Sequence, residues 1–358
     1  MKKYLFLLIT MIVGLSCKSY REFLELEYYN VPNAKDSIVD GLYIHGFINN
    51  QKAKFLFDTG STSTVVENLD LLGGKDILNS STSKKIITAK GADGIEMSLY
   101  KIKSSSLSIN TYKSKNRYFV TFDKKQIKNN CIKDLINSRD AILGLDAFIY
   151  SETPVLLDYE NNILLTLDNN QIPRGYVQID SEIRNNRIIL KADINNVKIS
   201  LLFDTGNNDY IILSKNPFSK EQEDIAYETG MMTANQTKSY PLNKVYINRP
   251  INIGGIKSDK NRISVIESFK TNGVGIQFIN KYNWIIDFKK KKLYAKKIKD
   301  FEMSEYLEKM SAIKYKVLEM NGSLIIFHKN DPQNKFNVGD EIVSVDDIII
   351  SKDNICEL

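Results

Sequence analysis

The chain has 358 residues, of which 42% are hydrophobic and 26% are charged, and its formal net charge is +6. This is the composition of an ordinary globular protein with room for two or three domains, which excludes a largely disordered or fibrous chain. The two histidines and three cysteines argue against a metal site built from several such ligands, and they exclude most Ser-His and Cys-His nucleophile designs. We therefore expect neither a metal nor a cofactor.

The N-terminus resembles a bacterial export signal. Lys2 and Lys3 precede an apolar stretch, Tyr4–Leu15, that is too short to span a bilayer. Ser16-Cys17 then resembles the cleavage point of a bacterial lipoprotein, in which the cysteine carries the lipid. We expect a signal peptide over residues 1–16, a lipidated Cys17 and a linker over 17–35. The lipid would anchor the protein to a membrane of the cell envelope, facing the periplasm or the cell surface; the alternative is plain secretion.

Beyond the linker, the chain consists mainly of short runs rich in β-branched and aromatic residues, bounded by Asn, Gly, Asp and Ser. Such runs are typical of β-strands, and long helical periodicity is scarce, so we expect an all-β fold. The clearest predicted strands are Leu42–Ile48, Ala53–Phe57, Ile86–Ala89, Val155–Leu157 and Ile163–Leu165.

An internal repeat organises this part of the chain. An apolar run that ends in Phe leads into Asp58-Thr59-Gly60-Ser61 in the first copy and into Asp204-Thr205-Gly206-Asn207 in the second. Each copy continues with a short segment that ends in Gly and then a closing apolar run that ends in Asp. These later markers are Ile142-Leu143-Gly144 and Asp158 in the first copy, and Gly273-Val274-Gly275 and Asp287 in the second. The repeat predicts two lobes, over 36–168 and 169–300.

The repeated triplet carries the chemistry. A carboxylate at the end of an apolar strand is costly unless it is hydrogen-bonded or functional, and Asp58 and Asp204 both occupy such a position. The threonine that follows supplies a hydroxyl, and the glycine lets the backbone turn sharply. One triplet alone could be an Asx-type turn that closes a strand. Two triplets in the same context favour a functional pair of carboxylates.

With these motifs, approximately residues 36–300 resemble the aspartic peptidases, in particular the retropepsin-like family and its two-lobed pepsin-type relatives. The resemblance implies two closed β-barrel lobes related by pseudo-twofold symmetry, within one chain that is a monomer and an internal pseudo-dimer. Asp58 and Asp204 would be catalytic, share one proton and activate a water molecule. Thr59 and Thr205 would lock the two loops together, while Gly60 and Gly206 would donate backbone N–H groups to the carboxylates.

The resemblance also implies a β-hairpin flap over an extended polypeptide substrate. The candidate is Ile86–Tyr100, with Gly91, Ala92, Asp93 and Gly94 at its tip. The alternative is an ordinary surface hairpin. The counterpart in the second copy, Thr233–Gln236, has no glycine at its tip, so we expect one working flap. Ser61 fits the family pattern after the triplet, whereas Asn207 departs from it; Asn207 could still donate a hydrogen bond to a carboxylate.

The C-terminal part begins with a charged connector over 301–311. Val338-Gly339-Asp340-Glu341-Ile342 and the residues after it then resemble a segment of bacterial PDZ domains, which bind peptide termini by strand addition. We expect a short partial PDZ-like α+β tail over 312–358, either truncated or leaning on the second lobe. The alternative is a simple β-hairpin tail.

The sequence therefore predicts an aspartic endopeptidase that cleaves extended polypeptides. The runner-up is a catalytically silent, envelope-anchored peptide-binding protein with the same fold. Nucleic acid is not expected as a partner, because the lysine run at Lys289–Lys292 is typical of a solvated hairpin edge. Cys131 and Cys356 could form a disulfide in an oxidising compartment or remain two thiols.

Overall fold

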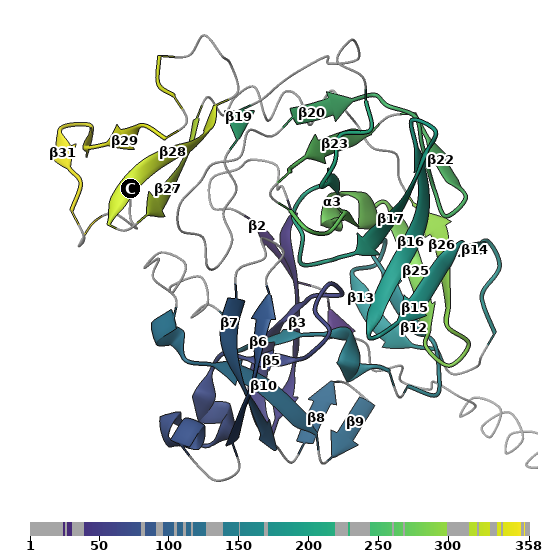
Figure 1. The fold of residues 1–358 in the computed structure, drawn as a ribbon. Coiled ribbons are helices and arrows are strands. Elements are labelled where there is room, and N and C mark those ends of the chain that lie inside the picture. The colour runs from purple at the N-terminus through teal and green to yellow at the C-terminus, as the bar shows by residue number, and fades with distance from the viewer. Residues whose placement is uncertain are drawn as a thin grey trace, which may run out of the picture.

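The computed structural model describes most residues between 39 and 298 and shorter stretches on either side. The described residues are 24–25, 27–30, 39–79, 83–90, 96–103, 106–109, 112–115, 117–126, 139–149, 151–167, 171–218, 228–229, 244–259, 261–267, 269–298, 315–320, 322–329, 335–337, 339–351 and 354. The predicted signal peptide, the connector and all three cysteines lie outside these ranges, so those predictions stay predictions. Figure 1 shows one β-rich lobe below and a second above it.

The first lobe is a curled sheet centred on β3 (Val39–Ile48) and β4 (Gln51–Phe57). Ala53, Phe55 and Phe57 of β4 are buried while the residues between them are partly exposed, which is the period-two pattern of a strand with one face on the core. The strands lie in the order β6-β7-β10-β5-β11-β4-β3-β8-β9, with β2 beside β3. The other elements are β2 (Glu27–Asn30), β5 (Val65–Val66), η1 (Leu69–Leu72), η2 (Lys75–Asn79), β6 (Ser83–Lys90), β7 (Glu96–Lys103), β8 (Ser106–Ile109), β9 (Tyr112–Lys115), β10 (Tyr118–Phe122), η3 (Lys124–Gln126), β11 (Ala141–Leu143) and η4 (Leu145–Ala147).

The second lobe is a curled sheet centred on β16 (Arg187–Ile194) and β17 (Val197–Phe203). Every second residue of β16 is buried, as expected for a strand that covers a core with one face. The strands lie in the order β20-β23-β18-β24-β17-β16-β21-β22, with β15 beside β16. The remaining elements are β15 (Ser181–Arg184), β18 (Ile211–Leu213), β20 (Lys244–Ile247), β21 (Ile251–Ile253), β22 (Ile256–Ser258), β23 (Arg262–Val265), β24 (Gly273–Val274) and α3 (Ile276–Ile279).

The two sheets repeat one pairing pattern. In the first lobe β4 is parallel to β11, and in the second β17 is parallel to β24. The registers correspond, because Phe57 lies opposite Leu143 and Phe203 lies opposite Val274. The neighbouring pairs also match: β5 is parallel to β10, and β18 is parallel to β23. The sequence repeat is thus a structural repeat, and the predicted all-β fold with two lobes is confirmed.

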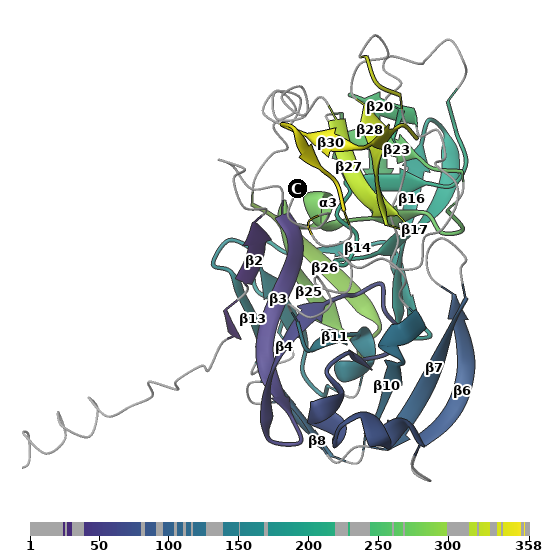
Figure 2. The ribbon, with the colours of Figure 1, turned by 90° about the vertical axis from the view of Figure 1, so that its left-hand side faces the viewer.

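A third sheet joins the lobes (Figure 2), with its strands in the order β1-β13-β12-β25-β26-β14. At its centre β12 (Val155–Asp158) pairs with β25 (Tyr282–Asp287), with Leu157 opposite Trp284. Every residue of these two strands is buried, which explains their continuous apolar runs. The other strands are β1 (Leu24–Glu25), β13 (Ile163–Thr166), β14 (Val177–Ile179) and β26 (Lys292–Lys297). The predicted linker over 17–35 therefore contributes two short strands, β1 and β2.

The hydrophobic core runs without a break from one lobe to the other. Trp284 is fully buried at the junction, and its ring centroid lies 4.8 Å from that of Phe203, in an edge-to-face arrangement. Its Nε1 donates to the carbonyl oxygen of Ile279 at 2.7 Å, so the polar atom of this large side chain is satisfied. Burial across the junction ties the two lobes together.

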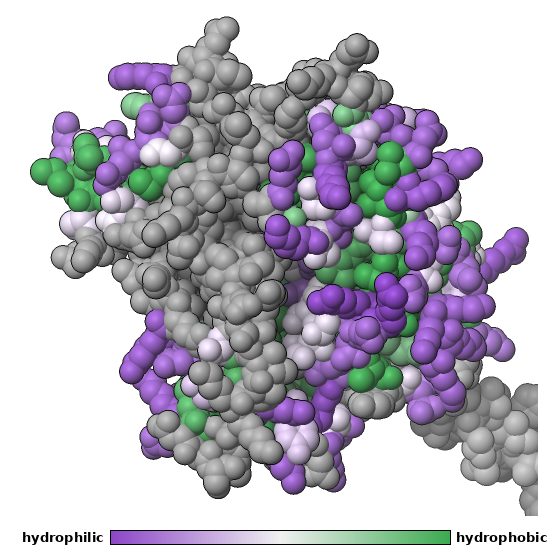
Figure 3. Space-filling model, in the orientation of Figure 1, coloured by the Kyte–Doolittle hydropathy of each residue, from purple (hydrophilic) through white to green (hydrophobic). Residues whose placement is uncertain are grey.

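The described C-terminal residues form small sheets. β28 (Ser323–Lys329) pairs with β27 (Tyr315–Met320), β29 (Glu341–Ile342) and β19 (Glu228–Thr229), and β30 (Ser344–Val345) pairs with β31 (Ile348–Ile349). Val343, Ile348 and Ile349 are exposed, and Figure 3 shows hydrophobic residues gathered at this outer end. The described residues of 312–358 thus add β-structure, and β28 pairs with β19 of residues 228–229. Its PDZ-like character stays a prediction.

Asn283 offers a test of the junction. This residue is 2% exposed; its Oδ1 accepts from the N–H groups of Tyr159 at 2.7 Å and Glu160 at 3.1 Å, and its Nδ2 donates to Asp158 at 2.8 Å. We expect Asn283→Ala to lower the free energy of unfolding by about 3 kcal/mol, because it leaves backbone donors unpaired. Urea denaturation measures the loss.

The matched control is Asn252→Ala, which removes a single exposed hydrogen bond to the N–H of Gly255. It should cost less than about 1 kcal/mol. Equal losses for the two variants would contradict the role assigned to Asn283.

Candidate active site

Each Asp-Thr-Gly triplet begins where a buried strand ends. β4 ends at Phe57 and β17 ends at Phe203, and both phenylalanines are fully buried. The N–H of Asp58 donates to the carbonyl of Leu143, and the N–H of Asp204 donates to that of Val274, both at 3.0 Å. The neighbouring parallel strand therefore fixes the direction in which each triplet leaves its sheet.

The two triplets hold each other through their threonines. Thr59 Oγ1 donates to the carbonyl of Phe203 at 2.8 Å and accepts from the N–H of Thr205 at 3.0 Å. Thr205 Oγ1 reciprocally donates to the carbonyl of Phe57 at 2.7 Å and accepts from the N–H of Thr59 at 3.0 Å. Both threonines are 0% exposed, so the four bonds lie away from competing water. This exchange brings the two predicted loops together.

The carboxyl groups meet where glycines leave room for them. A Cβ atom on Gly60 would lie 2.4 Å from Cγ of Asp204, and one on Gly206 would lie 2.5 Å from Cγ of Asp58. No side chain fits in either space, which is the physical reason for a glycine at both positions. Each carboxyl group therefore packs against the triplet of the other lobe, and the two hydrogen-bond to each other.

Backbone donors complete the pair. Asp58 Oδ1 accepts from the N–H of Gly60 at 2.8 Å and from that of Ser61 at 3.1 Å. Asp204 Oδ1 accepts from the N–H of Gly206 at 3.0 Å. Both aspartates keep a partly exposed surface, so water can reach them. The backbone thus orients two carboxyl groups toward each other and toward solvent.

The electrostatics of the pair favour one retained proton. Burial raises the pKa of Asp204 well above its ordinary value, and repulsion by Asp58 adds to the increase. Burial also raises the pKa of Asp58, while hydrogen bonds from Asp204, Gly60 and Ser61 and the charge of Arg139 act in the opposite direction. Two adjacent carboxyl groups of this kind titrate as one unit with two apparent pKa values.

The residues that directly follow Gly144 and Gly275, here called the crossing glycines, bond to the triplet loops. The N–H of Leu145 donates to the carbonyl of Ser61 at 3.1 Å, and that of Ile276 donates to the carbonyl of Asn207 at 2.8 Å. A Cβ atom on Gly144 would lie 2.7 Å from the carbonyl of Ser63, so this close approach also needs glycine. Gly275 approaches the backbone of Asn207 in the same way.

The residues that follow the triplets bond to their own loops. Ser61 Oγ donates to the carbonyl of Ser63 at 2.8 Å. Asn207 Oδ1 accepts from the N–H of Asp209 at 2.9 Å, which closes an Asx turn. The side chain of Asn207 therefore acts on the shape of its own loop, while its backbone N–H donates to the carboxyl group of Asp204.

The predicted flap corresponds to the hairpin of β6 and β7, whose register runs from Ser83 opposite Ile102 to Lys90 opposite Glu96. Gly91, Ala92, Asp93 and Gly94, the predicted tip, lie outside the described residues, as does the counterpart over 233–236. The hairpin is thus present in the first lobe, and its role as a flap stays a prediction.

Sequence reasoning missed a buried ion pair near Asp58. Arg139 Nε donates to Glu67 Oε2 at 2.6 Å, and Arg139 Nη2 donates to Glu67 Oε1 at 2.9 Å. The side chains of Arg139 and Glu67 are only 12% and 1% exposed. The only sequence signal for this ion pair was a glutamate directly after the apolar pair Val65-Val66, and this pattern is equally typical of an exposed residue at the end of a strand.

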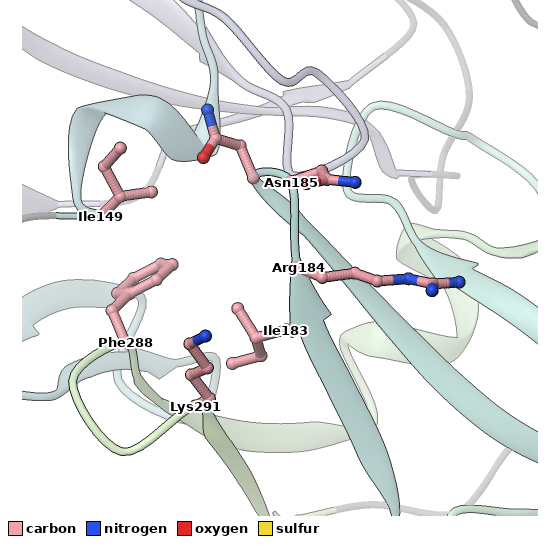
Figure 4. Close-up of a pocket in the computed structure, with 7 residues that line it drawn as sticks. Ile149, Ile183, Arg184, Asn185, Phe288 and Lys291 are labelled. Atoms are coloured by element: carbon pink, nitrogen blue, oxygen red, sulfur yellow. The ribbon is translucent and has the colours of Figure 1, made fainter.

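A separate hollow of about 170 Å³ lies between the β15–β16 turn, the β25–β26 turn and the end of η4. Figure 4 shows Ile149, Ile183 and Phe288 around it, with Arg184 extending away. Asn186 on its rim donates to the carbonyl of Thr62 at 3.1 Å, which ties this turn to the loop after Asp58. None of the polar residues that line it is buried.

Within the described ranges, no group of three or more His, Cys, Asp or Glu side chains is placed to hold a metal ion. Nor does any helix in this part of the chain have the length and apolar character needed to cross a membrane. No protein-family model matches the chain, and no curated protein sequence matches it. The function therefore has to be argued from the site itself.

The threonine exchange gives a testable energy. Thr205→Val keeps the shape of the side chain but leaves the carbonyl of Phe57 and the N–H of Thr59 unpaired. We expect the free energy of unfolding to fall by about 3 kcal/mol, whereas Thr205→Ser, which keeps the hydroxyl, should cost about 1 kcal/mol. Thermal and urea denaturation give both values, and similar losses for Val and Ser would show that the hydroxyl is unimportant.

The raised pKa of Asp204 predicts a pH-dependent stability. When folding raises the pKa of an acid, the protonated acid contributes its full stabilisation below the pKa of the unfolded state, about 3.9. This contribution is lost as the pH rises through the pKa of the folded state. At neutral pH the carboxyl group of Asp204 thus lowers the free energy of unfolding of the wild type, and Asp204→Asn removes this destabilisation. We expect the variant to be more stable at neutral pH, with an advantage that shrinks on acidification. Asp180→Asn, at an exposed position, should show no such trend in urea titrations at several pH values.

Proposed function

We propose that the protein is an aspartic endopeptidase in which Asp58 and Asp204 share one proton and activate a water molecule. The observation that carries the proposal is that each carboxyl group lies against the glycine of the opposite triplet, where the two groups hydrogen-bond to each other. A structural role alone gives no reason to bury two acids against each other, because the pair destabilises the fold when both ionise. The fold proposed for the lobes is correspondingly the pepsin-like or retropepsin-like one.

In the proposed reaction the ionised carboxyl group takes a proton from the water as the water oxygen attacks the scissile carbonyl carbon. The protonated carboxyl group donates to the carbonyl oxygen, and a tetrahedral diol forms without a covalent enzyme intermediate. The C–N bond then breaks as the leaving nitrogen receives a proton from one carboxyl group, while a diol hydroxyl returns its proton to the other carboxylate and the C=O bond of the product acid forms. One proton remains between the carboxyl groups, so the pair is ready for the next cycle.

The substrate class proposed is an extended polypeptide lying between the two lobes. The partly exposed edges of Asp58 and Asp204 would face its scissile bond, and the hairpin of β6 and β7 is the element proposed to close over it. A lipid on Cys17 would hold the enzyme at the cell envelope, and the C-terminal segment would act as a PDZ-like unit. A silent peptide-binding protein is the competing function, and the intact pair of aspartates and threonines favours the enzyme.

Cleavage of unfolded casein tests the proposal. Over roughly pH 3 to 8, the wild type should release peptides and be inhibited by pepstatin, because the pair has one proton within part of this range. Asp58→Asn and Asp204→Asn should each lose at least about 1000-fold in activity, since the water is then no longer activated.

Asp180→Asn serves as the control and should cleave like the wild type, because Asp180 is exposed outside the site. Undiminished cleavage by both variants of the pair would refute the assigned site. A wild type that binds casein peptides without cleaving them would favour the silent peptide-binding protein.

A further inference from the structure

The buried pair of Arg139 and Glu67 is tied to the strands that carry Asp58. Arg139 lies just before β11, Glu67 lies just after β5, and β11 runs parallel to β4 up to the Asp58 triplet. Asp140 links the three strands, because its carbonyl accepts from the N–H of Glu67 at 2.8 Å and its Oδ2 accepts from the N–H of Lys54 at 2.8 Å. The ion pair is therefore fixed relative to the catalytic aspartate.

Burying this pair is costly, because two charges have to leave water. Burial alone disfavours the charged guanidinium, but the hydrogen bonds and charge of Glu67 outweigh it, so the pKa of Arg139 is raised. The cation is thus permanent across the range in which carboxyl groups titrate. Tyr43 and Asp58 also act electrostatically on Arg139, and Lys54 Nζ lies 4.8 Å from the centroid of the Tyr43 ring.

The second lobe has no equivalent pair at the matching positions. The strand registers place Val65 opposite Ile142 and Ile212 opposite Gly273, so Glu67, two residues after Val65, corresponds to Ser214. Counted from Gly144 and Gly275, Arg139 corresponds to Lys270. Ser214 is uncharged and partly exposed, and it hydrogen-bonds to Asn272, whereas Lys270 is exposed to solvent. The two lobes are therefore alike in topology, but only the first has a buried ion pair at these two positions.

We propose that Arg139, oriented by Glu67, is a positioning residue that keeps the negative charge of the pair on Asp58 and the shared proton on Asp204. This inference rests on the proposed function of the pair. Arg139 attracts the carboxylate of Asp58 and so opposes the effect of burial on its pKa, whereas the largest influences on the pKa of Asp204 include no cation. Asp58 would then be the base that takes the proton of the water, and Asp204 the acid.

Opposite charge changes in the ion pair provide the test. Arg139→Gln removes the cation, so both limbs of the pH profile of kcat/KM should move to higher pH. Glu67→Gln removes the anion and leaves the cation, so both limbs should move to lower pH. The double variant, which lacks the anion as well as the cation, should lie between the wild type and Arg139→Gln. Arg139→Lys keeps the charge and should bring the profile most of the way back to that of the wild type. A purely structural role predicts lower stability for all variants and no ordered shift.

A second readout separates this inference from the proposed function. Titration of the full chain labelled with ¹³C at its Asp carboxyl groups reports the protonation of the pair even in a protein that cleaves nothing. With Asp58→Asn and Asp204→Asn used to assign the signals, Asp58 should ionise first in the wild type, and this order should weaken in Arg139→Gln. Shifts of the same sign in the two Gln variants, or a first ionisation at Asp204, would overturn the role of Arg139. Loss of cleavage with these titrations intact would overturn only the peptidase assignment.

Discussion

Two carboxyl groups held in contact repel each other unless one keeps a proton, and the surrounding structure has to resist that repulsion. The threonine exchange does so from both sides, since Thr59 and Thr205 bond to each other and to the carbonyl of the phenylalanine that precedes the opposite triplet. These bonds join residues up to 148 positions apart in the chain. The site is consequently a property of the two lobes together, and neither lobe could form it alone.

The third sheet explains how two lobes in one chain keep such a contact in register. β12 and β25 are buried on both faces and pair directly, and Asn283 fixes the backbone where β12 turns toward β13. A site that contains two desolvated acids lowers stability at neutral pH, so the compensation has to come from elsewhere in the fold. The unbroken core around Trp284 is the main apolar mass available for this at the junction.

The repeat made the fold and the central pair predictable, because Asp58, Asp204 and the two crossing glycines recur in the same order in both copies. The short strands were predictable from local sequence, since the alternation of apolar residues in segments such as β4 matches their alternating burial. The Arg139–Glu67 pair was not, because its members are 72 positions apart and nothing local shows that either is buried. Asn207 illustrates the same limit, since only the folded loop shows which backbone group its side chain meets.

Duplication by itself would give two equivalent aspartates, yet the proposed reaction needs one base and one acid. Hydrogen bonds within the triplets cannot distinguish them, because Gly60 and Gly206 make the same contact in each lobe. A difference between the two aspartates therefore has to come from residues outside the repeat motif. A charged residue near the triplet loop of only one lobe, such as Arg139, is one way to introduce it. In the second lobe Ser214 stands at the position of Glu67 and bonds to Asn272, so no charge is buried there. The first lobe instead accepts the cost of a buried ion pair, which is expected where the pair serves the chemistry more than the stability.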